Sequence, residues 1–277
     1  PYQATKEVLQ EISGAIIAIT LVMTAVFVPV TFVPGPVGVF YRQFGVTMTA
    51  NLSRTSDMLA PELVPMPMDA PDVCPLCRSG RTRVDRLCFS CERTSSQVDF
   101  PCEMVIPISY YTTPSPLRDR MHHYKEHPDP SVREEEARYV SAILARYVAQ
   151  HHDLFVDRFG NWDSVVAVPS THHPDAPALQ VAVEANFPEA LGPFTRPLVL
   201  GPGTMKFNQA SPLGFVPRAG ESLTDHRVLL VDDTFTTGAR LQSAHHALVA
   251  AGAVVVVAVV VTRKINPSQQ YGSDRLW

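Results

Sequence analysis

Short runs of apolar residues, separated by a stretch with helical spacing, mark the C-terminal part of the chain. Residues 228–231 form one run, and residues 254–261 form a second that is almost purely valine. Residues 238–251 between them carry apolar side chains at helical spacing, and Gly252 follows as a left-handed stop. Valine-rich runs are typical of strands buried on both faces of a parallel sheet. The pattern predicts strand, crossover helix and strand, with ligands at the carboxyl ends of the strands.

The pattern upstream predicts a further strand and two helices. Residues 162–168 are predicted as a strand that leads into a polar loop. Residues 117–124 are predicted as one helix, and residues 131–150 as a longer one that opens with a capping box. The chain is therefore predicted to be an α/β protein, with helices on both faces of a parallel sheet.

The first part of the chain has a different pattern. Residues 12–30 are almost wholly apolar, which is long enough for a transmembrane helix of ~20 residues. Four prolines in residues 51–71 indicate an extended linker. We predict four parts: an apolar segment at 1–50, the linker at 51–71, a small cysteine-bearing unit at 72–102 and the α/β domain at 103–277.

Composition narrows the range of partners. The chain has 277 residues, and its 45% apolar content is enough for a real core. A net charge of −4 and a pI near 6.2 argue against general affinity for nucleic acid. Residues 78–93 nevertheless hold five arginines against two acids. This Arg-rich segment is either a site for DNA or RNA or a solvated face.

The most informative motif follows the apolar run at 228–231. Asp232 and Asp233 come directly after this run, and a hydroxyl-rich stretch then leads through Gly238 into the predicted helix. A helix start offers unpaired N–H groups to a phosphate, whereas two acids suit sugar hydroxyls or Mg²⁺. The motif predicts a sugar-phosphate ligand. The alternative is a strand-turn-helix in which the two acids only end the strand and cap the helix.

This motif resembles the phosphoribosyl-diphosphate (PRPP) loop of the type I phosphoribosyltransferases, in which four apolar residues and two acids precede a Thr/Gly loop. The resemblance implies a type I phosphoribosyltransferase-like parallel sheet, with Mg²⁺ bound alongside PRPP. It implies that Asp232 and Asp233 hold the ribose hydroxyls and are the catalytic pair. The residues implied for the 5′-phosphate are Thr234, Phe235, Thr236, Thr237 and Gly238.

The loop expected to hold the diphosphate is poor in cations. No Arg or Lys occurs between the strand that ends near residue 168 and Arg196. Ser170 and Thr171 still offer backbone and hydroxyl donors. Lys206 and Arg218, in a Gly/Pro-rich loop, either swing towards the ligand or stay solvated.

Four of the five cysteines form two Cys-x-x-Cys pairs. Cys74 and Cys77 make the first pair, and Cys88 and Cys91 the second. Two such pairs are typical of a tetrahedral, structural zinc site, since four thiolates leave no open position on the metal. Disulfides or redox-active pairs are the competing interpretation; disulfides need an oxidising compartment, and no signal peptide with a cleavage site is visible. Cys102 is predicted to be a buried thiol.

A zinc ribbon followed by this domain resembles the ComF-type, competence-associated family over about residues 71–266. The resemblance implies PRPP binding, a bound zinc and a link to DNA uptake or processing. The predicted function is transfer of a phosphoribosyl group to or from a nucleobase-like small-molecule acceptor, with diphosphate as co-product. The alternative is a non-catalytic sensor of PRPP or a nucleotide, whose zinc ribbon binds nucleic acid or a DNA-uptake partner.

Residues 1–50 resemble a transmembrane segment of resistance-nodulation-division (RND) efflux pumps. A natural fusion, a chimeric gene model or an accidental junction near residue 50 would each explain this. One helix cannot form a transport pathway, so transport is not the expected function. We expect a cytoplasmic protein, tethered to a membrane through residues 12–30 if that helix is a genuine part of the protein.

Overall fold

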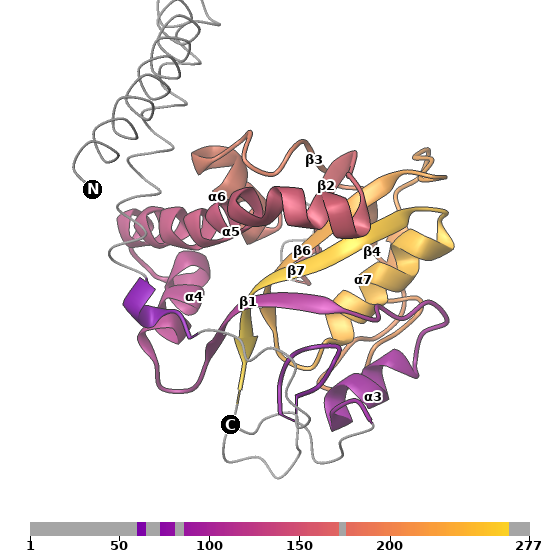
Figure 1. Cartoon of the computed structure of the whole chain (residues 1–277), viewed down its shortest axis with the longest axis horizontal. Coiled ribbons are helices and arrows are strands. Elements are labelled where there is room, and N and C mark those ends of the chain that lie inside the picture. The colour runs from indigo at the N-terminus through magenta and orange to yellow at the C-terminus, as the bar shows by residue number, and fades with distance from the viewer. Residues whose placement is uncertain (1–59, 65–72, 81–85, 172–175, 266–277) are drawn as a thin grey trace, which may run out of the picture. The chain divides into compact units, whose positions relative to one another are not determined.

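The computed structural model describes residues 60–64, 73–80, 86–171 and 176–265. Within the compact unit 55–277, a five-stranded sheet has the order β1-β7-β6-β2-β3, and every neighbouring pair is parallel (Figure 1). These strands are β1 (Val105–Tyr111), β2 (Ser164–Ala167), β3 (Phe194–Thr195), β6 (Arg227–Phe235) and β7 (Val254–Lys264). A separate antiparallel pair is formed by β4 (Leu198–Leu200) and β5 (Phe215–Pro217).

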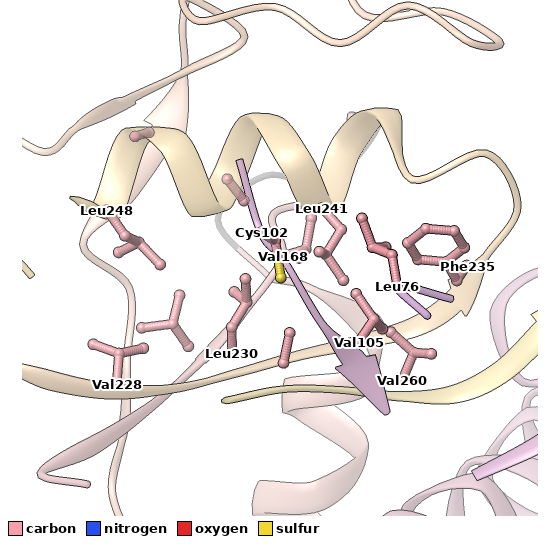
Figure 2. Close-up of a cluster of buried hydrophobic side chains, with 14 of the residues drawn as sticks. Leu76, Cys102, Val105, Val168, Val228, Leu230, Phe235, Leu241, Leu248 and Val260 are labelled. Carbon is pink, nitrogen blue, oxygen red and sulfur yellow. The ribbon is translucent and has the colours of Figure 1, made fainter. Parts of the chain in front are cut away.

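Helices cover both faces of the sheet. Helix α7 (Ala239–Ala250) places Leu241 and Leu248 in a buried cluster with Leu230 of β6 (Figure 2). Because side chains alternate along a strand, neighbouring positions of β6 and β7 point to the other face. There α5 (Pro130–Phe159) packs against β1 and β7. The valine-rich β7 is apolar throughout because it is covered on both sides, and the predicted parallel α/β fold class is confirmed.

The remaining described elements are short. They are the 3-10 turn η1 (Ala60–Glu62), α3 (Phe89–Ser95), α4 (Pro116–Glu126) and α6 (Ala178–Asn186). Gly252 has φ +92°, so the predicted left-handed stop after α7 is confirmed.

Two predicted boundaries were wrong. Helix α5 begins at Pro130 and runs to Phe159, rather than from residue 131 to about 150. Its N-cap is Asp129, whose carboxylate accepts the N–H of Ser131 at 2.9 Å, and a proline in the first turn suits this start. Strand β6 does not end before the acids. It continues to Phe235 because the long strand β7 extends its ladder, pairing Asp232 with Val260.

The N-terminal predictions lie outside the described residues. These include the apolar segment at 1–50, its helix at 12–30 and most of the linker. Across the described part of the chain, every helix is either too short or too polar to cross a bilayer. The four-part division of the chain therefore stays a prediction.

Candidate active site and cysteine centre

The two acids lie near the carboxyl end of β6 and are held by different helices. Each is 7% exposed. Asp233 accepts a hydrogen bond from the Tyr124 hydroxyl and forms an ion pair with Lys125, both on α4. An Asp232 oxygen lies 3.9 Å from a terminal guanidinium nitrogen of Arg240, in the first turn of α7. The acids are therefore a buried, partly neutralised pair and not a simple strand end.

A side-chain cap and two ion pairs hold helix α4 in the position from which Tyr124 and Lys125 reach Asp233. Ser115 caps it by accepting the N–H of Arg118 at 3.2 Å. Arg120 ties the helix to its neighbours, with Nε 2.7 Å from Glu62 and Nη1 2.8 Å from Glu136. Anchoring on two carboxylates limits the movement of the helix that carries Tyr124 and Lys125.

The pKa values of the two acids are shifted in opposite directions. Burial raises the pKa of Asp232 to about 6, against the opposing effect of Arg240. Burial also acts to raise the pKa of Asp233, but Lys125 and Tyr124 more than offset it and hold that pKa below its usual value. At neutral pH both carboxylates are ionised, and the charge of Asp232 is the costly one.

The free energy of unfolding should depend on pH because ionising the buried Asp232 carboxyl is costly. The folded state binds the Asp232 proton more tightly than the unfolded state, so this residue's contribution to stability is lost as pH rises from about 4 to about 6. The shift from 3.8 to about 6 corresponds to about 3 kcal/mol. We expect Asp232→Asn to be more stable than the wild type at pH 7 and the difference to shrink towards pH 4. Urea unfolding of both proteins from pH 4 to pH 7 measures this difference in the free energy of unfolding. A difference that is constant with pH would contradict the raised pKa of Asp232.

The loop after the acids has a backbone that only glycine accommodates well. Gly238 has φ +84° and is the N-cap of α7. A Cβ at this position would come within 2.5 Å of the Phe235 ring. Phe235 itself is 1% exposed and belongs to the core cluster, so its side chain anchors the loop to the core. The close contact between these two residues sets the shape of the turn.

Gly238→Ala is expected to destabilise the fold by about 2–3 kcal/mol, because it adds a steric clash to an unfavourable φ. Gly220→Ala is the matched control. Gly220 has φ +86°, but nothing lies within 4 Å of its Cβ position. Urea unfolding of the two variants separates backbone strain from the clash, and equal losses would show that the Phe235 contact does not matter.

Two adjoining cavities meet at Asp232. A cavity of about 580 Å³ is lined by both acids together with Ser170, Thr171 and the α4 residues. A second cavity of about 280 Å³ is lined by the predicted phosphate loop. Asp232, Thr171 and Arg240 line both. The structure thus brings together Thr234, Thr236, Thr237 and Gly238 with the acids and with the loop after β2.

Arg240 is a cation that the sequence analysis missed. One of its terminal nitrogens donates to the Pro169 carbonyl at 3.3 Å. Its Nε is buried and has no hydrogen-bond partner among the described residues. An unpaired buried donor is costly, and Arg240 lines the shared cavity, where its guanidinium is available to an anionic ligand. Its place two residues after Gly238, at the positive end of α7, is the signal that could have identified it.

The other predicted cations differ in position. Lys206 lines the smaller cavity beside the loop. Arg218 lines neither of the two cavities, and its Nε donates to the Arg196 carbonyl at 3.2 Å. Tyr124 and Lys125 were missed because nothing in the local pattern of α4 distinguishes them from other helix residues.

The four paired cysteines form one buried cluster. Their Sγ atoms all lie within 4.8 Å of one another, and those of Cys77 and Cys88 are 3.7 Å apart. A tetrahedral zinc with bonds of ~2.3 Å places its sulfurs ~3.8 Å apart. The N–H of Cys88 also donates to Cys74 Sγ at 3.4 Å. The cluster fits a structural zinc, with Cys74, Cys77, Cys88 and Cys91 as ligands.

The disulfide alternative does not fit the cysteine geometry. All five cysteines are free, and 3.7 Å is far longer than an S–S bond of ~2.05 Å. Cys102 is buried outside the cluster, where its thiol donates to the Met104 carbonyl at 3.1 Å. Burial raises the pKa of Cys102 to about 12, as expected for a buried thiol.

Comparison with known proteins confirms the RND resemblance at the N-terminus. Residues 1–69 match the AcrB/AcrD/AcrF family, so the match extends past the junction predicted near residue 50. The chain is 43% identical over 53 residues to a toluene efflux pump membrane transporter, TtgE, of Pseudomonas putida. It is 38% identical over 53 residues to the multidrug export protein AcrF of Escherichia coli. Each match covers 19% of this chain and only 5% of the relative.

Solved structures similar to this chain include two adenine phosphoribosyltransferases. The enzyme of Trypanosoma brucei, in complex with AMP, pyrophosphate and ribose-5-phosphate, is 17% identical, with a TM-score of 0.30. That match covers 55% of this chain and 81% of the other. The enzyme of Leishmania donovani is 16% identical over 50% of this chain and 77% of the other, with a TM-score of 0.28. Neither score is high enough to assign an activity.

Proposed function

We propose that the α/β domain binds PRPP with Mg²⁺ and transfers the phosphoribosyl group between PRPP and a nucleobase-like acceptor. One observation carries this proposal: the buried acid pair and the start of α7, which is capped by Gly238, line two adjoining cavities. Acids suit the ribose hydroxyls and the helix start suits the 5′-phosphate, so the site offers complementary groups to both parts of a sugar phosphate.

In the proposed reaction, the bond between the anomeric carbon and the diphosphate oxygen breaks, and diphosphate leaves with the bonding electrons. A bond from that carbon to an acceptor nitrogen forms, and the proton of that nitrogen passes to the departing diphosphate or to water. Asp232 and Asp233 accept hydrogen bonds from the ribose hydroxyls and favour the positive charge that develops on the sugar. Thr234, Thr236, Thr237 and Gly238 hold the 5′-phosphate and so orient the anomeric carbon, whereas the predicted phosphate residue Phe235 lies in the core and lines neither cavity. Asp232 would help to hold Mg²⁺, which would neutralise the charge of the leaving group.

Cations already present at the site suit the departing diphosphate. The unsatisfied Nε of Arg240 and the ammonium of Lys125 both belong to residues that line the larger cavity. Lys125 also neutralises Asp233, so its ammonium lies between the acid pair and the space available to the diphosphate. These two residues supply part of the positive charge that the Arg-poor loop after β2 lacks.

The non-catalytic sensor remains the second proposal, and that Arg-poor loop is the observation that favours it. Sensing needs the ribose and phosphate contacts but not efficient release of diphosphate. The Arg-rich ribbon would then supply the nucleic-acid contact. In its described part, however, Arg86 lies 3.5 Å from Glu92 and Arg93 donates to the Asn208 carbonyl at 3.2 Å. These internal contacts compete with a role in binding DNA or RNA.

The test is calorimetric titration of the full chain with PRPP in the presence of Mg²⁺, followed by a diphosphate-release assay with a panel of nucleobases. Saturable binding with diphosphate release supports the transferase. Binding without release for any base supports the sensor, and DNA binding that weakens steeply with salt would strengthen that conclusion. No PRPP binding by a folded, zinc-loaded protein would rule out the transferase and a PRPP sensor, and leave only a sensor of another nucleotide.

A further inference from the structure

Arg263 of β7 lies between the cysteine centre and the phosphate loop. Its side chain is fully buried. Nη1 donates to the carbonyl of Phe235 at 3.2 Å and to that of Thr236 at 2.6 Å. The guanidinium is also within hydrogen-bonding reach of the Cys77 side chain.

A second contact joins the same two sites. Thr94 of α3 is fully buried, and its hydroxyl lies 2.8 Å from the Ser90 carbonyl and 3.3 Å from the Thr237 carbonyl. Helix α3 begins directly after Cys88 and contains Cys91. The ribbon and Arg263 therefore contact three consecutive carbonyls of the loop, those of residues 235, 236 and 237.

These contacts determine where the loop N–H groups point. In a trans peptide the carbonyl and the N–H of the next residue point in opposite directions. Carbonyls 235 to 237 face Arg263 and Thr94, so the N–H groups of residues 236 to 238 face away from them. The smaller cavity is lined by these same three residues, Thr236, Thr237 and Gly238. The donors available to a phosphate are thus set by the contacts on the opposite side of the loop.

We propose that Arg263 and Thr94 are positioning residues through which the cysteine centre holds the phosphate loop in its binding shape. The inference rests on the proposed function for the identity of the ligand, but the loop's dependence on the ribbon can be measured without any ligand. It gives the zinc ribbon a role in the chemistry of a site that none of its cysteines lines. Because binding linkage is reciprocal, ligand binding should in turn raise the affinity of the cysteine centre for zinc.

The experiment compares Thr94→Val with Thr94→Ser in the full chain, alongside Arg263→Met and Arg263→Lys. Valine keeps the shape of threonine and removes the hydroxyl, whereas serine keeps the hydroxyl. Methionine removes every donor from position 263, and lysine keeps the charge without the planar fork. Three quantities are measured for each protein: zinc content, hydrogen exchange of the peptide covering residues 234–240, and the Kd for PRPP with Mg²⁺.

With one zinc still bound, Thr94→Val and Arg263→Met should exchange the loop amides about tenfold faster than the wild type. The Kd for PRPP should rise about threefold in Thr94→Val and at least about tenfold in Arg263→Met. Thr94→Ser should stay within about twofold of the wild type, and Arg263→Lys should fall in between. In the wild type, saturating PRPP should lower the fraction of zinc that a competing zinc-selective colorimetric chelator holds at equilibrium.

Wild-type loop exchange in a folded, zinc-loaded Thr94→Val protein would overturn the inference, even if Arg263→Met does not fold. So would an equilibrium zinc affinity that PRPP leaves unchanged in a wild type that binds it. If the wild type binds no PRPP, the proposed function fails, and the exchange measurements still decide whether Thr94 and Arg263 position the loop.

Discussion

Asp232→Asn/Asp233→Asn should lose at least about a hundredfold in affinity for PRPP, measured calorimetrically with Mg²⁺ present. Asparagine keeps the shape of each side chain but lacks the negative charge that makes a strong acceptor for two ribose hydroxyls. Turnover, if present, should fall further, because the carboxylates also favour the positive charge that develops on the sugar in the transition state.

The single variants separate this functional loss from a loss of stability. Asp232→Asn should bind poorly yet be more stable than the wild type at neutral pH, because burial raises the pKa of Asp232 to about 6. Asp233→Asn should be less stable, because it leaves Lys125 without its charged partner. An Asp232→Asn protein with wild-type affinity for PRPP would contradict the role given to this acid.

A carboxylate that costs stability and faces a cavity is expected at a functional site rather than at a structural one. Asp232 has that character, whereas Asp233 is compensated by Tyr124 and Lys125. The alternative in which both acids only end a strand and cap a helix is therefore a poor account of Asp232. Strand β6 continues past both acids, and the N-cap of α7 is Gly238.

Contiguous features were predictable from the sequence. The valine-rich strand, the acid pair, the loop that turns at Gly238 and the two Cys-x-x-Cys pairs each depend on residues close together in the chain. Their local geometry follows from period, spacing and residue type. The parallel sheet then places the acids and the loop after β2 at one edge, so Thr171 and Asp232 line the same cavities.

Residues that act across the fold could not be predicted in this way. Lys125 reaches Asp233 only because Arg120 anchors α4, and Arg263 reaches the loop only because β7 runs beside β6. No neighbour in sequence indicates the partner of either residue. Arg263 is unusual only in its position at the end of a valine-rich strand, where a charged side chain needs a partner that the local sequence does not supply.

Removing zinc should have the second large effect, because the cysteine centre is part of the main core. Cys74, Cys77, Cys88 and Cys91 lie in the same buried cluster as residues of the sheet and α7, together with Leu76. Cys88→Ser should abolish stoichiometric zinc binding and lower the Tm by more than about 10 °C. Metal content by mass spectrometry and thermal unfolding by calorimetry measure the two effects.

Cys102→Ser is the matched control. Cys102 is also a buried thiol of the core cluster, but its Sγ donates to the Met104 carbonyl and it is not among the four clustered sulfurs. It should keep one zinc per chain and lose only about 1–2 kcal/mol of stability. Loss of zinc in Cys102→Ser, or full zinc in Cys88→Ser, would contradict the ligand set. Because Arg263 links the centre to the phosphate loop, the Cys88→Ser protein should also lose affinity for PRPP, whereas Cys102→Ser should retain it.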